Sequence, residues 1–180
     1  KDDALQLIAS IEGRHKKIVK ELFDADTTKF LHKHIAVFAE ELAALVNGVF
    51  VLGELTPRSL DAFAAYGERM SSFIVHHYFE SRKLRSFLVD ARSFMITDEH
   101  FTKAAPMFEV VEQMLREIVQ PKIDNYYVVI TQGFVGSTQT GITTTIGRGG
   151  SDYSAAIIGA LLGADDIQIT TSYPVLRGQT

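Results

Sequence analysis

Apolar residues recur at helical spacing along the first part of the chain. They predict a helix over residues 4–23, with an apolar face made of Leu5, Ile8, Ile11, Ile18 and Leu22. Asp26-Thr27-Thr28 is typical of a helix start, and Asn47-Gly48 is typical of a helix end. We therefore expect a second helix that runs to about Val46 and forms an antiparallel hairpin with the first.

The middle of the chain alternates between helical and strand patterns. Thr56-Pro57 predicts a helix start, Gly67 its end, and residues 68–82 a further helix, while the run 49–52 has no clear period. Helices are also predicted over 106–119 and 151–162, and a loop over 133–141. Short apolar runs predict strands at 86–90, 94–97, 126–131 and 167–169. Strands separated by helices favour an α/β fold: a three-layer sandwich with a mainly parallel sheet and helices on both sides.

Composition narrows the class of protein. The 180 residues fit one domain, and the 46% hydrophobic and 22% charged content is globular. The net charge of −4 argues against nucleic acid or an anionic membrane as a partner. The absence of cysteine excludes disulfides and thiolate chemistry. No apolar run approaches the roughly 20 residues of a membrane span, so we expect a cytoplasmic protein.

The stretch 141–164, GITTTIGRGGSDYSAAIIGALLGA, has the pattern of an anion-binding site. A glycine-rich loop leads directly into an apolar helix, whose first N–H groups and dipole attract anions. Arg148 adds a forked cationic donor. Ser151 and Asp152 have two interpretations: they begin the helix as ordinary capping residues, or Asp152 holds a metal ion or a lysine beside the anion.

Other polar residues leave alternatives open. Gln132-Gly133-Phe134 follows a predicted strand, so it should converge with the 141–151 loop at the carboxyl end of the sheet. Glu68 either complements a helix dipole or pairs with a substrate ammonium group. Asp90 and Asp98-Glu99 are either structural loop acids or part of the same sheet end. The chain contains no P-loop, dinucleotide fingerprint or nucleophile elbow, and its paired histidines lack chelating spacing.

Several segments together resemble the aspartokinases, most closely the monofunctional lysine-sensitive type. They are VITQGFVG at 129–136, GITTTIGRGGSDYSAA at 141–156, GERMS at 67–71, VDAR at 89–92 and ITDEHF at 96–101. The resemblance is strong from Leu55 to Ile169 and only architectural before that. It implies the amino-acid-kinase (carbamate-kinase-like) fold, incomplete at both ends, with a helical hairpin region over 1–53 and a substrate-binding core over 54–180.

The resemblance also implies an activity: transfer of the ATP γ-phosphate to the side-chain carboxylate of L-aspartate, giving 4-phospho-L-aspartate. This is the first step of aspartate-family (lysine, threonine and methionine) amino-acid biosynthesis, with ATP and Mg²⁺ required. Arg148 would grip a substrate carboxylate and Glu68 the ammonium group. Phe134 would line the substrate pocket. Gly149, Gly150 and Ser151 would lie along the phosphate path, and Ser151 would also contact the substrate. Asp152 would organise the catalytic cations. No dedicated metal ligand is assigned.

The chain departs from the family pattern in three respects. The Lys-Phe-Gly-Gly-Thr-Ser loop, the Trp-Thr-Asp and Asp-Pro-Arg motifs and the regulatory (ACT) domains that bind an end-product amino acid are not found in this sequence, and both ends look cut. We expect the isolated polypeptide to be inactive and the full-length protein to be a homodimer. Two alternatives remain at this point: a kinase for a glutamate-type acid, and a truncated domain that binds a small acid without turnover.

Overall fold

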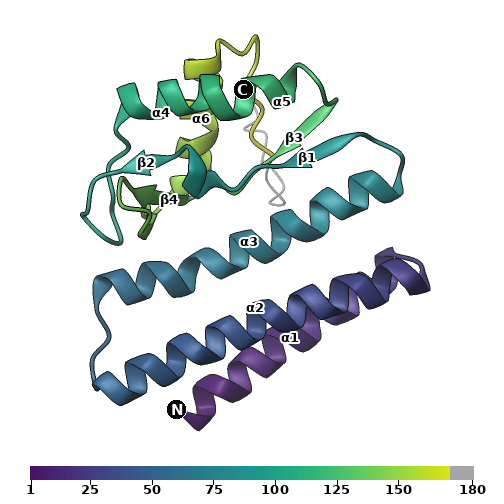
Figure 1. Ribbon diagram of the computed structural model, residues 1–180, viewed down its shortest axis with the longest axis vertical. Coiled ribbons are helices and arrows are strands. Elements are labelled where there is room, and N and C mark those ends of the chain that lie inside the picture. The colour runs from purple at the N-terminus through teal and green to yellow at the C-terminus, as the bar shows by residue number, and fades with distance from the viewer. Residues whose placement is uncertain (171–180) are drawn as a thin grey trace, which may run out of the picture.

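The structure is a computed structural model that describes residues 1–170, and the rest of the predicted substrate-binding core, 171–180, lies outside the described residues. Helices α1 (Asp2–Leu22) and α2 (Ala25–Leu52) form the predicted antiparallel hairpin, and α3 (Pro57–Ser81) lies beside them (Figure 1). Residues of all three helices share a buried cluster that includes Val19, Leu31 and Ile74. The helical layer is therefore held together by its own apolar core.

Both predicted ends of α2 are wrong by a few residues. Asp24, not Asp26, is the N-cap, and its carboxylate accepts the Thr27 N–H at 2.9 Å. The helix continues through Gly48 and ends at Gly53, whose φ of 72° is the left-handed conformation of a helix cap. A glycine inside a helix costs only about 1 kcal/mol, and the apolar run 49–52 continues the helix past it.

Helix α3 is one element rather than the two that were predicted. It begins as expected, with Thr56 Oγ1 accepting the Ser59 N–H at 3.1 Å and Pro57 in the first turn. It then passes through Gly67 without a break, because Ala65 and Met70 are buried on either side of this glycine. Glu68 consequently lies in the middle of a long helix and not at a helix start.

The rest of the described chain forms an α/β unit whose strands lie between α3 and a second helical layer (Figure 1). Strand β1 (Ser86–Leu88) pairs in parallel with β3 (Val128–Ile130). Strand β2 (Ile96–Thr97) pairs in parallel with β4 (Val135–Thr138), which pairs in antiparallel with β5 (Thr143–Thr145). A short 3₁₀ helix, η1 (Ala91–Ser93), joins β1 to β2. The three layers and the mainly parallel pairing confirm the predicted fold class.

The second helical layer contains α4 (Phe108–Met114), η2 (Leu115–Val119), α5 (Gln120–Ile123) and α6 (Gly150–Leu162). The first three are continuous, and η2 is a turn of π-helix. Pro121 accounts for the widened turn, since it has no N–H to donate and its ring crowds the preceding carbonyl groups. The core beneath this layer consists of Val89, Ala91, Phe94, Met95, Val111, Leu115, Val119 and Ile157.

Two strand predictions fail. The segment 133–141 was expected to be a loop but contains β4, because small and polar residues conceal a strand that is buried along its whole length. Residues 167–169 were expected to be a strand but are irregular. Ile167 and Ile169 are exposed there, and no other described segment pairs with them.

Helix α2 also has a composition that bears on membranes. Among residues 1–170 it is the one helix long and apolar enough to cross a bilayer, with a mean hydropathy of 1.9 over its most apolar window. Core helices of globular proteins meet the same criterion. Here α2 contacts α1 and α3 (Figure 1), but only 17% of that window is buried by the described residues.

Candidate functional site

The two segments that were predicted to converge do so. Phe134 and the turn Gly147–Asp152 line one hollow of about 280 Å³ at the start of α6. Strand β4 follows Phe134 and β5 leads into the turn, so the antiparallel pairing of these strands brings the two segments together. The Ile146 N–H donates to the Phe134 carbonyl at 2.9 Å and extends this pairing to the rim.

Glycine is required at several points of the turn. Gly147 and Gly149 have φ values of 88° and 76°, in the left-handed region that disfavours side chains. A Cβ atom on Gly147 would lie 3.0 Å from the Thr102 carbonyl oxygen, and one on Gly150 would lie 2.9 Å from Phe134 Cδ2. The absence of side chains at these positions lets the backbone of the turn approach its neighbours closely and line the hollow itself.

Phe134 is held in an unusual backbone conformation. Its φ of 67° is rare for a residue other than glycine and costs on the order of 1–3 kcal/mol. The Phe134 N–H donates to Ser154 Oγ at 3.0 Å, and Ser154 Oγ donates to the Gly150 carbonyl at 2.7 Å. These contacts fix the phenyl ring against the first turn of α6, where it forms one wall of the hollow.

The amino end of α6 presents backbone donors without a side-chain cap. Gly149 is the N-cap, which corrects the expectation that Ser151 caps the helix: Ser151 lies inside the first turn. Within residues 1–170, no hydrogen-bond acceptor contacts the backbone N–H of Ser151 or of Asp152. A 13-residue helix with open N–H groups and a positive dipole end favours an anion at this position.

Arg148 and Asp152 contribute opposite charges to the hollow. Both side chains are exposed, and neither makes an ion pair or hydrogen bond with another described residue. The guanidinium can therefore bind a carboxylate or phosphate in two-pronged fashion. The Asp152 carboxylate is an oxygen ligand of the kind that Mg²⁺ prefers, although residues 1–170 hold no group of three or more acidic or histidine side chains arranged for a metal.

Glu68 lies outside this hollow, on the central part of α3. Asp61, Glu68 and Ser72 are spaced by seven and four residues and therefore share one face of the helix. Asp61 binds Thr145 before the glycine turn, and Ser72 binds Gln132 before Phe134. Glu68 thus sits between the two connections from α3 to the segments of the hollow. Burial raises the pKa of its carboxyl group.

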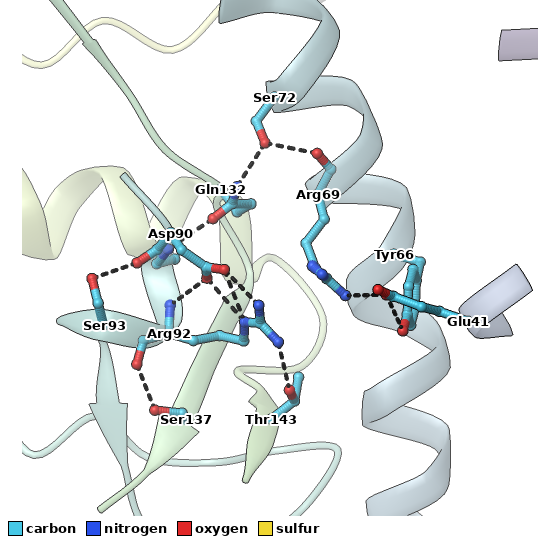
Figure 2. A network of polar contacts seen from close by, with 11 residues as sticks. Glu41, Tyr66, Arg69, Ser72, Asp90, Arg92, Ser93, Gln132, Ser137 and Thr143 are labelled. Atoms are coloured by element: carbon cyan, nitrogen blue, oxygen red, sulfur yellow. Dashed lines mark hydrogen bonds and ion pairs between the residues drawn. The ribbon is translucent and has the colours of Figure 1, made fainter. Parts of the chain in front are cut away.

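A second polar network lies at the carboxyl ends of β1 and β3 (Figure 2). Arg92 donates to both oxygens of Asp90, at 2.6 Å from Nη2 and 2.9 Å from Nε. Burial alone would raise the pKa of Asp90, but the hydrogen bonds from Arg92 outweigh it and lower the pKa. Asp98 accepts the N–H groups of His100 and Ala105, at 3.1 and 3.0 Å. Of the open alternatives, these contacts favour structural roles for both acids.

Two buried polar residues connect α3 to the segments of the hollow. Sequence reasoning expected Gln132 near the glycine loop without identifying its partners, and it missed Asp61. Gln132 is only 4% exposed; its Oε1 accepts the Ala91 N–H at 2.7 Å and its Nε2 donates to Ser72 Oγ at 2.7 Å (Figure 2). Asp61 is 1% exposed and accepts three hydrogen bonds. One signal in the sequence could have identified Asp61. It lies on the same helix face as the buried Ala65, where an acid without hydrogen-bond partners would be costly, so its position indicates that such partners exist.

Comparisons with known proteins indicate the family of the chain. The sequence profile of the amino acid kinase family matches residues 4–177. Lysine-sensitive aspartokinase 3 of Escherichia coli (strain K12) is 34% identical over 143 residues, which are 77% of this chain and 32% of that protein. The aspartokinase of Chlamydia muridarum is 30% identical over 166 residues, 92% of this chain and 35% of that protein. The chain thus spans about a third of the length of the curated relatives it matches.

Solved structures of an aspartokinase also match the chain. The crystal structure of E. coli aspartokinase III in complex with lysine and aspartate matches with a TM-score of 0.84 and 26% identity, over 91% of this chain and 36% of that chain. The structure of the same enzyme in complex with aspartate and ADP matches with a TM-score of 0.70 and 28% identity, over 87% of this chain and 34% of that chain.

Proposed function

Because the chain belongs to the amino acid kinase family, we propose that it supplies the amino-acid-binding part of an aspartokinase catalytic domain. In the complete protein, the activity would be ATP-dependent phosphorylation of the side-chain carboxylate of L-aspartate. The single observation that carries the proposal is the hollow at the start of α6, where Arg148 and open helix N–H groups meet. The named relatives, which are aspartokinases, make aspartate the favoured acid.

The proposed binding mode divides the substrate between two elements. Arg148, with no described partner, binds a carboxylate group of L-aspartate, and Phe134 packs against its carbon chain. Glu68 on α3 binds the ammonium group; its half-buried carboxylate has no described ion pair. A small acid with an amino group between two carboxylates provides a complementary charge for each residue.

The phosphate path follows the amino end of α6. Gly149 and Gly150 keep side chains away from the transferring phosphoryl group, and the N–H groups of Ser151 and Asp152 donate to its oxygens. Asp152 would contribute an oxygen ligand to Mg²⁺, which neutralises phosphate charge when bound. These assignments place anion-binding donors and a cation ligand on consecutive residues of one helical turn.

The chemistry does not require a general base. The side-chain carboxylate of aspartate has a pKa of about 3.9 and is ionised at neutral pH. One of its oxygens forms a bond to the γ-phosphorus of ATP, the bond between that phosphorus and the bridging oxygen breaks, and ADP leaves with the electron pair. The protein's task is to align the two substrates and to stabilise the charge of the transferring group.

Regulation and assembly are proposed from the relatives rather than from the chain. Residues 1–53 would form the helical hairpin region and residues 54–180 the substrate-binding core. An end-product amino acid would act through regulatory domains, and lysine is the ligand named with one of the matching structures. We further infer a homodimeric, cytoplasmic enzyme in its complete form.

Titration calorimetry of the chain with L-aspartate tests the proposal. Wild type should bind L-aspartate and discriminate against L-glutamate, whose longer side chain misplaces one carboxylate. Arg148→Ala should abolish binding without changing the melting temperature. Arg116→Ala removes another exposed arginine, which pairs with Glu112 and does not line the hollow, and it should leave binding unchanged. Retention of L-aspartate binding by Arg148→Ala would show that the site is assigned wrongly.

Addition of Mg-ATP separates the remaining functions. Formation of ADP that depends on L-aspartate, measured with the complete protein, supports the kinase. Preference for L-glutamate in the same assay would instead favour a kinase for a glutamate-type acid. Binding of L-aspartate by the complete protein with no ADP formed would favour a domain that binds an acid without turnover.

A further inference from the structure

Asp61 is a buried acid to which the proposed function assigns no role. Its carboxylate accepts the Thr102 N–H at 2.8 Å, the Thr145 N–H at 3.0 Å and the Thr145 hydroxyl at 2.5 Å. An ionised carboxylate only accepts hydrogen bonds, and all three contacts are donors to it. This arrangement satisfies a charge that is 1% exposed, and it connects α3 to two segments that lie more than 40 residues further along the chain.

Both partners of Asp61 shape the glycine turn. Thr145 ends β5, two residues before Gly147. Thr102 has a left-handed φ of 70°, and its carbonyl oxygen stands 3.0 Å from the place where a Cβ atom of Gly147 would lie. The Ala104 N–H donates to the Thr145 carbonyl at 2.9 Å and closes the connection between the two segments. Asp61 therefore holds both the strand that enters the turn and the loop that packs behind it.

The other end of the same helix face is also fixed. Ser72 binds Gln132, and Gln132 binds the Ala91 N–H (Figure 2). Glu68 lies between Asp61 and Ser72 on α3. Asp61, before Glu68, connects the helix to the β5 side of the hollow, and Ser72, after Glu68, connects it to the Phe134 side. These two connections therefore flank Glu68 and join its helix to both segments of the hollow.

We propose that Asp61 is a positioning residue, which fixes the Arg148 turn relative to Glu68 so that one amino acid can contact both. This inference rests on the proposed function for the identity of the ligand. Asp61 does not line the hollow and would not contact the ligand. It acts through Thr102 and Thr145, and its loss would let the turn move relative to α3.

Three variants and one matched control separate positioning from general stability. Asp61→Asn keeps the shape but turns an amide NH₂ toward groups that are themselves donors. Thr145→Val removes only the hydroxyl donor, and Thr145→Ser restores it. Leu31→Ala, in the fully buried core of the helical layer, lowers stability by making a cavity far from the turn. Leu31→Ala is therefore the control that shows how a loss of stability alone affects the site.

The first measurement needs no ligand. Amide hydrogen exchange should be followed at Ile146, Gly150 and Tyr153, whose N–H groups donate within or beside the turn at 2.9, 2.9 and 3.1 Å. It should become faster in Asp61→Asn and, to a smaller extent, in Thr145→Val, and Thr145→Ser should behave as wild type. Leu31→Ala should leave the exchange of these amides unchanged relative to the rest of the α/β unit. Equal exchange in Asp61→Asn and Leu31→Ala would overturn the inference, as would Thr145→Ser behaving like Thr145→Val.

The second measurement is calorimetry with L-aspartate. Asp61→Asn should weaken binding by about tenfold or more, since small misplacements of binding groups have effects of this size. Leu31→Ala should bind as wild type at a temperature where both are folded. An unchanged affinity in Asp61→Asn would overturn the positioning role. If wild type itself fails to bind L-aspartate, the proposed function fails, and the exchange of the Ile146, Gly150 and Tyr153 amides still decides the role of Asp61.

Discussion

Ser154 joins Phe134 to the first turn of α6 through a single hydroxyl group. This hydroxyl accepts the Phe134 N–H at 3.0 Å and donates to the Gly150 carbonyl at 2.7 Å, and the Ser154 side chain is buried. Phe134 has a left-handed backbone, so its N–H points away from the strand pairing that follows. One small side chain thereby connects the two segments that line the anion-binding hollow.

Ser154→Ala should destabilise the chain and weaken the site together. It leaves the half-buried Phe134 N–H without its partner, at a cost of about 1 kcal/mol in the free energy of unfolding. The affinity for L-aspartate should fall as Phe134 shifts. Urea denaturation and calorimetry measure the two effects. Ser81→Ala removes an exposed hydroxyl that donates to Tyr78 at 2.7 Å, and should change stability by less than about 0.5 kcal/mol. Equal effects of the two variants would contradict this account.

Gly136→Ala should destabilise the α/β unit, whereas Gly48→Ala should stabilise α2. A Cβ atom at Gly136 would lie 2.5 Å from the Met95 carbonyl oxygen, and the crowding should cost about 1–3 kcal/mol or more. Gly48 has open space around it inside a helix, so alanine there should add roughly 0.5–1 kcal/mol. Thermal and urea unfolding of both variants test the opposite signs, and a loss of stability in Gly48→Ala would mean that α2 does not continue through residue 48.

The free energy of unfolding should fall between pH 7.5 and pH 5.5 because of His76 and His77. Burial lowers the pKa of both imidazoles, His34 and His76 lower that of His77 further, and Glu80 partly opposes the shift. The fold therefore favours neutral imidazole. This stabilisation is complete above the unfolded pKa of about 6.5 and is lost as the pH falls below it, when the unfolded chain takes up protons first.

Urea unfolding at the two pH values measures this effect, and His77→Leu should reduce the difference. The raised pKa of Glu68 gives the opposite slope, because its protonated form is favoured in the fold and that stabilisation is lost as the pH rises. Comparison of His77→Leu with wild type cancels the Glu68 contribution. The carboxyl groups with lowered pKa values, such as Asp90, take up protons only at lower pH. An unchanged pH dependence in His77→Leu would exclude a contribution from His77.

The sequence was sufficient where the physical cause is local. Thr56-Pro57 starts a helix because its side chain and ring act within one turn, and the structure has that cap. The glycine turn before α6 was likewise visible, since glycine adopts the left-handed values found at Gly147 and Gly149 without the cost that a side chain adds. The pattern of strands and helices gave the fold class, and the motifs around Arg148 indicated the family that the profile match then showed.

Local signals misled where packing outweighed them. Gly48 and Gly67 indicated helix ends, but a glycine inside a helix costs only about 1 kcal/mol. Past Gly67 the burial of Met70 and Ile74 offsets this cost, whereas the apolar residues 50–52 past Gly48 continue the helix while exposed. Strand β4 escaped detection because its residues are small and polar, and it is stable as a strand only when β2 and β5 pair with it.

The sequence by itself therefore determined the helix start at Thr56-Pro57, the glycine turn and the chemistry that Arg148 can offer, since each depends on neighbours along the chain. Only the tertiary structure decided that Asp61 and Gln132 connect α3 to the two sides of the hollow. Their partners lie between 41 and 84 residues away in the sequence, and no spacing rule links residues at that separation. Hydrogen bonds of buried groups select such partners by position in space, after the layers have packed.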